Sequence, residues 1–460
     1  MRYPTDAAAR SLSVLILFTL FAGDFWRNLI GWWGYLGLVA AISAVVAVVM
    51  TRRRLWSKLA LWRLPRTLVL FGLLAVLSLA WSFYPGATVL GILAQAATTL
   101  GALFLVTALS WPQLISALST ALTWILGLSV LFELIVALFV RQPVLPFWTD
   151  YGGATVPKAF YWSQGALFTG GPIQGIVGNR NILAFVAVLA LITLGVQLAQ
   201  RLRRRNPTIA WLVVAVAVLA LTRSATAIGA LLITAVVFGA LLLARRVGPG
   251  RRMWVLAGVA VVTALAVVAV SAFWQQILSV FGKSDDLTGR VDIWNAVADL
   301  AAQRPAFGWG WVSYWAPWVE PFNDLAVRKG VTYLQAHDAW LDVWFQLGIV
   351  GLVLFIGLVL ATWYRTWWFA VDRPLDSLGL PIARVPLTLA PALLLTALIA
   401  QSFVESRMLV EGGWALLVVF AVKSKLDHSA VAIDLGNGPA RVNALLSRSA
   451  RTARTAASRR

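Results

Sequence analysis

Residues 208–244 read TIAWLVVAVAVLALTRSATAIGALLITAVVFGALLLA, which are two apolar runs separated by one charged residue, Arg223. Each run approaches the roughly 20 apolar residues that a helix needs to cross a bilayer. Arginine clusters flank the pair at 201–205 and 245–252. Because basic residues collect on the cytoplasmic side of membrane proteins, this stretch predicts two helices that cross a membrane and turn back at Arg223.

The same pattern extends over most of the 460 residues. The chain is 60% hydrophobic and 12% charged, far from the averages of soluble proteins. It predicts an all-α, polytopic integral membrane protein with about 12 transmembrane helices. We expect them near 11–23, 32–51, 67–82, 87–109, 114–140, 175–199, 208–222, 225–244, 254–272, 339–362, 385–403 and 411–423.

The basic residues predict the orientation of these helices. With both termini in the cytoplasm, 27 of the 38 Lys and Arg lie on the cytoplasmic side, as the positive-inside rule requires. The net charge of +20 is therefore explained by topology and by contact with anionic lipid, without nucleic acid. We expect a multi-pass protein of the cytoplasmic membrane whose functional face is periplasmic or extracellular.

The chain is expected to form one transmembrane domain over 1–422, followed by a basic, disordered cytoplasmic tail over 423–460. Two long loops, about 141–174 and 273–338, are predicted on the outer side. The chain has no cysteine, which excludes disulfides and thiol chemistry. No metal-ligand spacing or phosphate-cradling glycine loop occurs in the sequence, so we expect neither a metal nor a cofactor.

The second long loop is predicted to contain a helix. Ile293, Val297 and Leu300 recur at helical spacing, opposite a stripe of polar residues. This pattern indicates an amphipathic helix from Gly289 to about Gln303 that lies on the membrane or on the bundle. Thr288 is its expected N-cap.

His337 is the first candidate for chemistry, because it is one of only two histidines and opens a spanning helix at the water boundary. A histidine takes or gives a proton near neutral pH. The adjacent Asp338 is expected to orient or charge its imidazole. A histidine that merely marks the interface is the alternative.

Three arginines on the outer side are the next candidates: Arg180, Arg223 and Arg290. Arginine stays charged and offers a planar fork that matches phosphate oxygens. Together they would hold a pyrophosphate without a metal. The alternative for any single one is that it extends to lipid headgroups.

The remaining polar candidates have mainly structural interpretations. Glu405 and Arg407 lie on a short turn between the last two helices, where an ion pair that closes the bundle is the preferred interpretation. Glu133 falls inside a predicted helix and is assigned a structural hydrogen bond, since an unpaired carboxylate there is costly. Trp294 belongs to a set of tryptophans that either stack on sugar rings or anchor the interface.

The order of these pieces is specific. Asn181 opens one spanning helix and Thr222-Arg223-Ser224 another, and further motifs follow at 289–294, 304–310, 337–341 and 346–351. Over about 175–360 the chain resembles the O-antigen ligase and O-antigen polymerase superfamily of membrane glycosyltransferases. The resemblance implies an all-helical enzyme that uses a glycan carried on undecaprenyl diphosphate at the outer face, without a metal and with inversion.

The resemblance also implies roles for individual residues. In the pattern of the family, the histidine at 337 acts as base on the acceptor hydroxyl, and the arginines at 223 and 290 serve the diphosphate. Around them we assign a substrate-binding set, which comprises Arg180, Asn181, Asp338, Trp294 and Glu405. The sequence departs from the family at Asp338, where Asn or Ser is usual, and at Thr222, where Ser is usual.

The acceptor is left open by the sequence. It is a lipid-anchored sugar in a ligase, another lipid-linked repeat in a polymerase, or a protein, and ligase-type transfer is our expectation. A flippase or transporter of lipid-linked glycans is the alternative from another class. That alternative favours inverted repeats, broken helices and ionisable groups near the midplane. Here the candidate groups collect at one boundary and no repeat is evident in the sequence.

Overall fold

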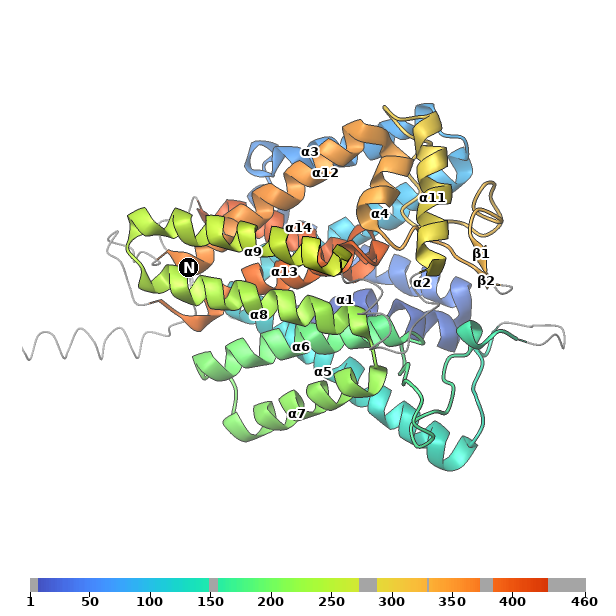
Figure 1. Cartoon of the computed structure of the whole chain (residues 1–460), viewed down its shortest axis with the longest axis horizontal. Helices are drawn as coiled ribbons and strands as arrows, with labels where there is room; N and C mark the ends of the chain where they lie inside the picture. Colours follow the sequence, from blue (N-terminus) through green and yellow to red (C-terminus); the bar gives the residue numbers. More distant parts are fainter. Residues whose placement is uncertain (1–6, 149–155, 273–287, 329–330, 373–383, 429–460) are drawn as a thin grey trace, which may run out of the picture.

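The computed structural model describes residues 7–148, 156–272, 288–328, 331–372 and 384–428, and within them the protein is an all-α polytopic membrane protein (Figure 1). The α-helices are α1 (Ala7–Phe21), α2 (Gly23–Arg52), α3 (Arg66–Leu77), α4 (Pro85–Ala108), α5 (Trp111–Ile135), α6 (Arg180–Gln200), α7 (Arg205–Thr222), α8 (Ala225–Arg246), α9 (Arg252–Ala272), α11 (Thr288–Gln303), α12 (Ala339–Val371), α13 (Ala390–Ser402) and α14 (Glu411–His428).

Short elements join these helices. A π-helical turn, η4 (Val136–Val140), extends α5, and two-residue strands β1 (Val327–Arg328) and β2 (Val331–Thr332) form an antiparallel ladder. The 3₁₀ turns are η1 (Leu55–Lys58), η2 (Leu61–Arg63), η3 (Ser78–Ala80), η5 (Lys158–Phe160), η6 (Pro249–Arg251), η7 (Pro386–Leu389) and η8 (Ser406–Leu409).

Each of the twelve predicted apolar stretches lies largely in a helix, which confirms the fold class, although the stretch predicted from residue 175 becomes helical only at Arg180. Among the described residues, seven helices are long and apolar enough to cross a membrane: α2, α4, α5 with η4, α6, α7, α8 and α12. α1, α3 with η3, and α13 with η7 are shorter apolar helices. The total of twelve crossings therefore stays a prediction, because it also requires the three shorter helices, α9 and α14 to cross the membrane.

α6 is the central helix of the bundle. Its most apolar window is 72% buried inside the protein, against 28% for α7 and 33% for α8. It packs on α5, α7 and α13, and Figure 1 shows it between α8 and α5. A helix that is apolar all round is expected in such a place, because protein surrounds it on every side.

α12 is broken where another segment of the chain enters it. Gly348 has a left-handed φ of 66°, and a Cβ there would come within 2.2 Å of the Ala306 backbone. The backbone N–H groups of Ile349 and Val350 donate to the carbonyls of Pro305 and Ala306, at 2.7 and 3.2 Å. Two motifs that the sequence places 40 residues apart, at 304–310 and 346–351, thus form one packed joint.

α11 confirms the predicted amphipathic helix and shows where it lies. It stands across one end of the bundle (Figure 1) and packs on α12. Ile293 and Val297 are buried, while Asp292 and Asp299 are exposed. The helix therefore lies on the protein. The Thr288 side chain, the expected cap, lies outside the described side chains.

The expected start of the tail at residue 423 is too early. α14 continues to His428, and Lys423 is only 6% exposed. Its ammonium donates to the carbonyls of Val106 and Leu109 at the end of α4, at 3.5 and 2.9 Å. A cation at a helix C-terminus satisfies carbonyls that have no partner within the helix. Residues 429–460 of the predicted tail lie outside the described residues.

Candidate active site

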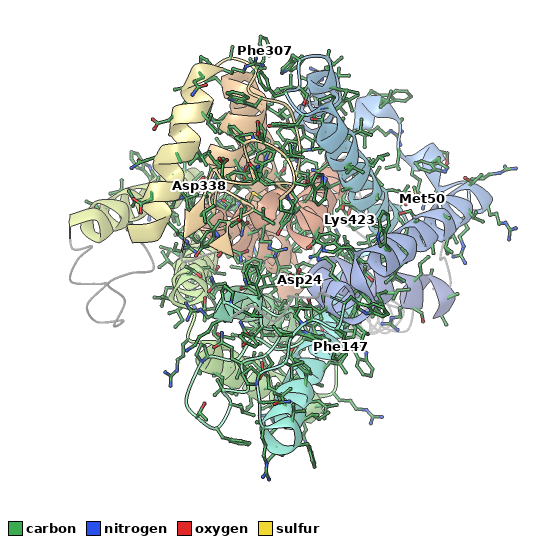
Figure 2. The ribbon with its side chains drawn as sticks, turned by 90° about the vertical axis from the view of Figure 1, so that its right-hand side faces the viewer. Asp24, Met50, Phe147, Phe307, Asp338 and Lys423 are labelled. Carbon is green, nitrogen blue, oxygen red and sulfur yellow. The ribbon has the colours of Figure 1, made fainter. Side chains whose placement is uncertain are left out.

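Four helices begin at one place in the structure. The side chain of Asn179 caps α6, Ser224 caps α8 and Asp338 caps α12, while α11 begins two residues before Arg290. Figure 2 looks onto this end of the molecule, with Asp338 beside α11. Each helix N-terminus carries a partial positive charge and N–H groups without helical partners. The place therefore favours an anion.

Glu405 is the side chain that joins the starts of three of these helices, α6, α11 and α12. One carboxylate oxygen, Oε1, accepts from Arg290 Nη2 at 3.0 Å and from Asn181 Nδ2 at 3.2 Å. The other, Oε2, lies 3.0 Å from His337 Nδ1 and accepts from Gln335 Nε2 at 3.2 Å. Glu405 comes from the turn between α13 and η8 and is 6% exposed.

A second hydrogen bond extends the network to α8. The Ser224 hydroxyl donates to Asn181 Oδ1 at 2.9 Å. The Asn181 amide therefore bridges the cap of α8 and the carboxylate of Glu405. This bridge fixes the two helix ends relative to each other, because both sides of one planar amide are engaged.

The surroundings of Glu405 keep it ionised. Burial by itself raises its pKa, but the facing His337 imidazole and the Arg290 guanidinium outweigh burial and hold the pKa at about 2. A buried carboxylate that accepts four hydrogen bonds is stable in this form. Glu405 is therefore a negative charge between Arg290 and His337, the two contacting residues that the sequence predicts to be catalytic.

The backbone before His337 is held from both sides. The Ala336 carbonyl accepts the indole N–H of Trp294 at 3.0 Å. The Ala336 N–H donates to Asp342 Oδ2 at 3.3 Å, and Asp342, 1% exposed, also accepts from Trp315 Nε1 at 2.9 Å. This support sustains the left-handed φ of 54° at His337, a conformation that costs free energy in a residue with a side chain.

The two ring nitrogens of His337 have different surroundings. Nδ1 faces Glu405, whereas Nε2 makes no hydrogen bond within the described part of the chain. A carboxylate at Nδ1 stabilises the tautomer with its proton on that nitrogen. Nε2 then carries the free lone pair. The arrangement is that of a general base with its orienting carboxylate.

Two interpretations from the sequence are wrong. Asp338 does not orient the imidazole: its Oδ1 accepts from the backbone N–H groups of Trp340 and Leu341, at 2.8 and 3.0 Å. Burial raises its pKa to about 6, against the effect of these two bonds. Glu405 also does not pair with Arg407, since Arg407 binds Asp24 and Glu411 instead.

The other predicted residues divide into two groups. Arg290 is in the network. Arg180 and Arg223 flank it, because they directly adjoin Asn181 and Ser224 in the chain. Arg223 is an exposed residue, and its guanidinium has no hydrogen bond or ion pair among the described residues. The indole N–H of Trp294 is used within the protein, so its stacking on a sugar stays a prediction.

Glu133 has the structural role expected from the sequence. It accepts from the backbone N–H groups of Gln174 and Gly175, at 2.9 and 2.7 Å, and from the Ser163 hydroxyl at 2.9 Å. These bonds shape the loop that leads into Asn179 and α6. Glu133 therefore supports the site from the end of α5 without belonging to it.

Sequence reasoning missed Gln335. In an extended segment alternate residues point to the same side, so its position two residues before His337 was the available signal. Gln335 Nε2 lies 3.3 Å from His337 Nδ1 as well as contacting Glu405.

Among the described residues, no group of three or more His, Asp or Glu is placed to hold a metal ion.

Comparison with known protein families identifies a similarity. The family model described as O-antigen ligase matches residues 210–356, a region that contains Arg223, Arg290 and His337. No curated protein matches the chain. The matched region holds the joint at Gly348 and the starts of α8, α11 and α12, whereas Asn181 and Glu405 lie outside it. Residues 210–356, less than half of the chain, are therefore similar to the O-antigen ligase family.

Proposed function

We propose that this protein is a glycosyltransferase that moves a glycan from undecaprenyl diphosphate to an acceptor hydroxyl at the outer face of the cytoplasmic membrane. His337 is the general base, and Arg223 and Arg290 serve the diphosphate, with Arg180 as a further contact. The observation that carries the proposal is the pairing of His337 Nδ1 with Glu405 at 3.0 Å, where four helices begin.

The electrostatics of the site fit a diphosphate leaving group. Four helices begin around Glu405, Arg290 binds its carboxylate at 3.0 Å, and Arg180 and Arg223 adjoin the network in the chain. Charge that grows on a departing diphosphate is stabilised by fixed cations and by oriented N–H groups. The free fork of Arg223 suits bidentate contact with phosphate oxygens. These groups support transfer without a metal as part of the proposal.

In the proposed reaction, His337 Nε2 accepts the proton of the acceptor hydroxyl while the hydroxyl oxygen attacks the anomeric carbon. The bond between that carbon and the diphosphate oxygen breaks, and its electron pair leaves with the diphosphate. Attack from the face opposite the leaving group inverts the anomeric centre. Glu405 stabilises the imidazolium that forms.

Ligase-type transfer and polymerisation of lipid-linked repeats use the same chemistry and differ only in the acceptor. We favour a lipid-anchored sugar as acceptor. Transport is disfavoured because the ionisable network lies at helix ends, whereas transporter sites lie near the bilayer midplane. Both helix ends and network belong to the face that the positive-inside rule places outside.

The test uses purified protein in detergent with an undecaprenyl-diphosphate oligosaccharide as donor. A lipid-anchored sugar and a second lipid-linked repeat are supplied in separate reactions. We expect a glycosylated product and free undecaprenyl diphosphate in one of them, and no product with His337→Ala. Product only on the second repeat would identify a polymerase. Binding of donor without product in either reaction would contradict the proposal.

A further inference from the structure

A second polar cluster lies beside the site. Arg27 binds Asp24 at 2.5 Å and Glu411 at 2.7 Å, and Arg407 binds the same two carboxylates at 3.4 and 3.1 Å. The four side chains form a closed ring of alternating charge, with exposed fractions of only 12–30%. The ring joins the start of α2, the start of α14 and η8. We call it the charge ring.

The charge ring adjoins the residue that orients His337. Arg407 lies two positions after Glu405, on η8, and η8 packs closely on α14. A Cβ on Gly413 of α14 would approach the Arg407 carbonyl oxygen to 2.0 Å, so only glycine permits this contact. On the other side, the Glu405 N–H donates to the Gln401 carbonyl at 3.0 Å. The Glu405 segment is therefore held between α13 and the ring.

The first turns of α2 connect the ring to the other half of the site. Gly31, with φ of 71°, separates these turns from the spanning part of α2. The Phe25 ring lies 6.4 Å from that of Trp162, and the Trp162 indole N–H donates to the Ile176 carbonyl at 2.8 Å. Ile176 precedes α6 and its Asn181. Figure 2 shows Asp24 between Asp338 and Phe147 of the first long loop.

We propose that Arg407, through the charge ring, is a positioning residue that sets the carboxylate of Glu405 against His337 and Arg290. The inference rests on the proposed function for its kinetic consequence only. Four hydrogen-bonding groups contact the carboxylate of Glu405. Their attraction would displace the Glu405 segment if that segment were not held in place. The ring opposes that movement because its charges are largely buried and each has two partners.

Removal of one member unbalances the ring. In Arg407→Met the carboxylates of Asp24 and Glu411 face a single arginine. A largely buried excess negative charge is unfavourable, and it repels the nearby carboxylate of Glu405. A displacement of about 1 Å at a catalytic group costs on the order of 10²-fold in rate. We expect kcat to fall about 10- to 100-fold with an unchanged KM for the donor.

A set of variants distinguishes a displaced Glu405 carboxylate from a general loss of thermal stability. Arg407→Met is compared with the neutral double variant Arg407→Met/Glu411→Gln, which leaves the Asp24–Arg27 pair intact. The double variant should regain thermal stability while kcat stays low. Arg407→Lys, which keeps the charge, should restore part of kcat. Arg252→Met is the matched control, because Arg252 is 12% exposed, like Arg27 of the ring, and its 2.7 Å pair with the exposed Asp372 lies elsewhere. It should keep full activity.

A second readout does not depend on activity. The chain has two histidines, so ¹⁵N-histidine labelling gives two sets of ring signals, and a His428→Gln background assigns them. In the parent and in Arg252→Met, His337 should be the tautomer with its proton on Nδ1. In Arg407→Met this tautomer should no longer dominate among the neutral forms.

Two results would overturn the inference: an unchanged His337 tautomer in Arg407→Met, or full recovery of kcat in the neutral double variant. The second would show that net charge alone matters. If the parent protein transfers no glycan, the proposed function fails, and the tautomer measurement still decides whether the charge ring positions Glu405.

Discussion

Replacing Glu405 with Gln tests the assignment of the catalytic pair most sharply. The two side chains have nearly the same size, so packing is preserved. The amide, however, can donate a hydrogen bond to His337 Nδ1, which at present lies 3.0 Å from a carboxylate oxygen. That bond requires the ring proton on Nε2. The nitrogen that should accept the proton of the hydroxyl then has no lone pair available.

The expected magnitude follows from the same contact. The pKa of Glu405, about 2 instead of 4.5, corresponds to about 3 kcal/mol of interaction that favours the charged form. The analogous carboxylate-to-amide change in a Ser-His-Asp triad lowers kcat by about 10⁴, because the wrong tautomer forms. We expect Glu405→Gln to lower kcat by about 10³- to 10⁴-fold, which is about 4–5.5 kcal/mol in the barrier.

The assay is release of undecaprenyl diphosphate together with formation of the glycosylated acceptor, measured at saturating donor and at neutral pH. Asp372→Asn is the matched control, since Asp372 is an exposed carboxylate paired with Arg252 at 2.7 Å. Its kcat should equal that of the parent. If Glu405→Gln keeps kcat within about threefold of the parent, less than 1 kcal/mol in the barrier, the reasoning on the His337 tautomer is refuted.

Three further changes have defined outcomes. Arg223→Lys should raise the KM for the donor about tenfold, because an ammonium cannot contact two phosphate oxygens as a fork does; donor titrations of transfer rate measure this. Glu133→Leu should lower the free energy of unfolding by about 2–5 kcal/mol, because it leaves buried N–H groups of Gln174 and Gly175 without an acceptor; thermal unfolding in detergent measures this. The pKa of Glu405 is lowered in the folded protein, so its ionised form stabilises the fold above pH 4.5 and this contribution is lost as the pH falls towards 2. The Tm difference between the parent and Glu405→Gln should therefore shrink over that range.

Each of these outcomes can fail on its own. An unchanged donor KM in Arg223→Lys would remove this side chain from diphosphate binding. A Glu133→Leu variant as stable as the parent would show that the loop before α6 finds other acceptors. A Tm difference that grows on acidification would mean that the carboxylate of Glu405 is not stabilised in its ionised form.

The helices were predictable because their signal is local. Apolar runs of suitable length mark each helix, and α11 follows from the spacing of Ile293 and Val297. The break at Gly348 was not predictable from spacing alone, since it arises from a segment about 40 residues earlier that takes over backbone hydrogen bonds of α12.

The candidate base was predictable, but its partner was not. His337 is conspicuous because histidine is rare in this chain. Its neighbour Asp338 was the natural candidate for orienting it, yet an aspartate before a helix is better used as a cap. Glu405 lies 68 residues away and reaches His337 only through the packing of α12 on α13.

The predicted ion pair between Glu405 and Arg407 was wrong for the same physical reason. Glu405 and Arg407 are close in sequence, but the 3₁₀ turn at η8 sends them to different partners. The partners of Arg407 include Asp24, from the other end of the chain. Proximity in sequence does not decide between partners of opposite charge when the bundle brings others nearer.

The measurement that tests the central claim most directly pairs donor binding with a single turnover in the parent and in His337→Ala. The account predicts that both proteins bind the undecaprenyl-diphosphate oligosaccharide with equal affinity and that only the parent transfers its glycan to the acceptor. Transfer by His337→Ala at the rate of the parent would contradict the assignment of His337 as the base.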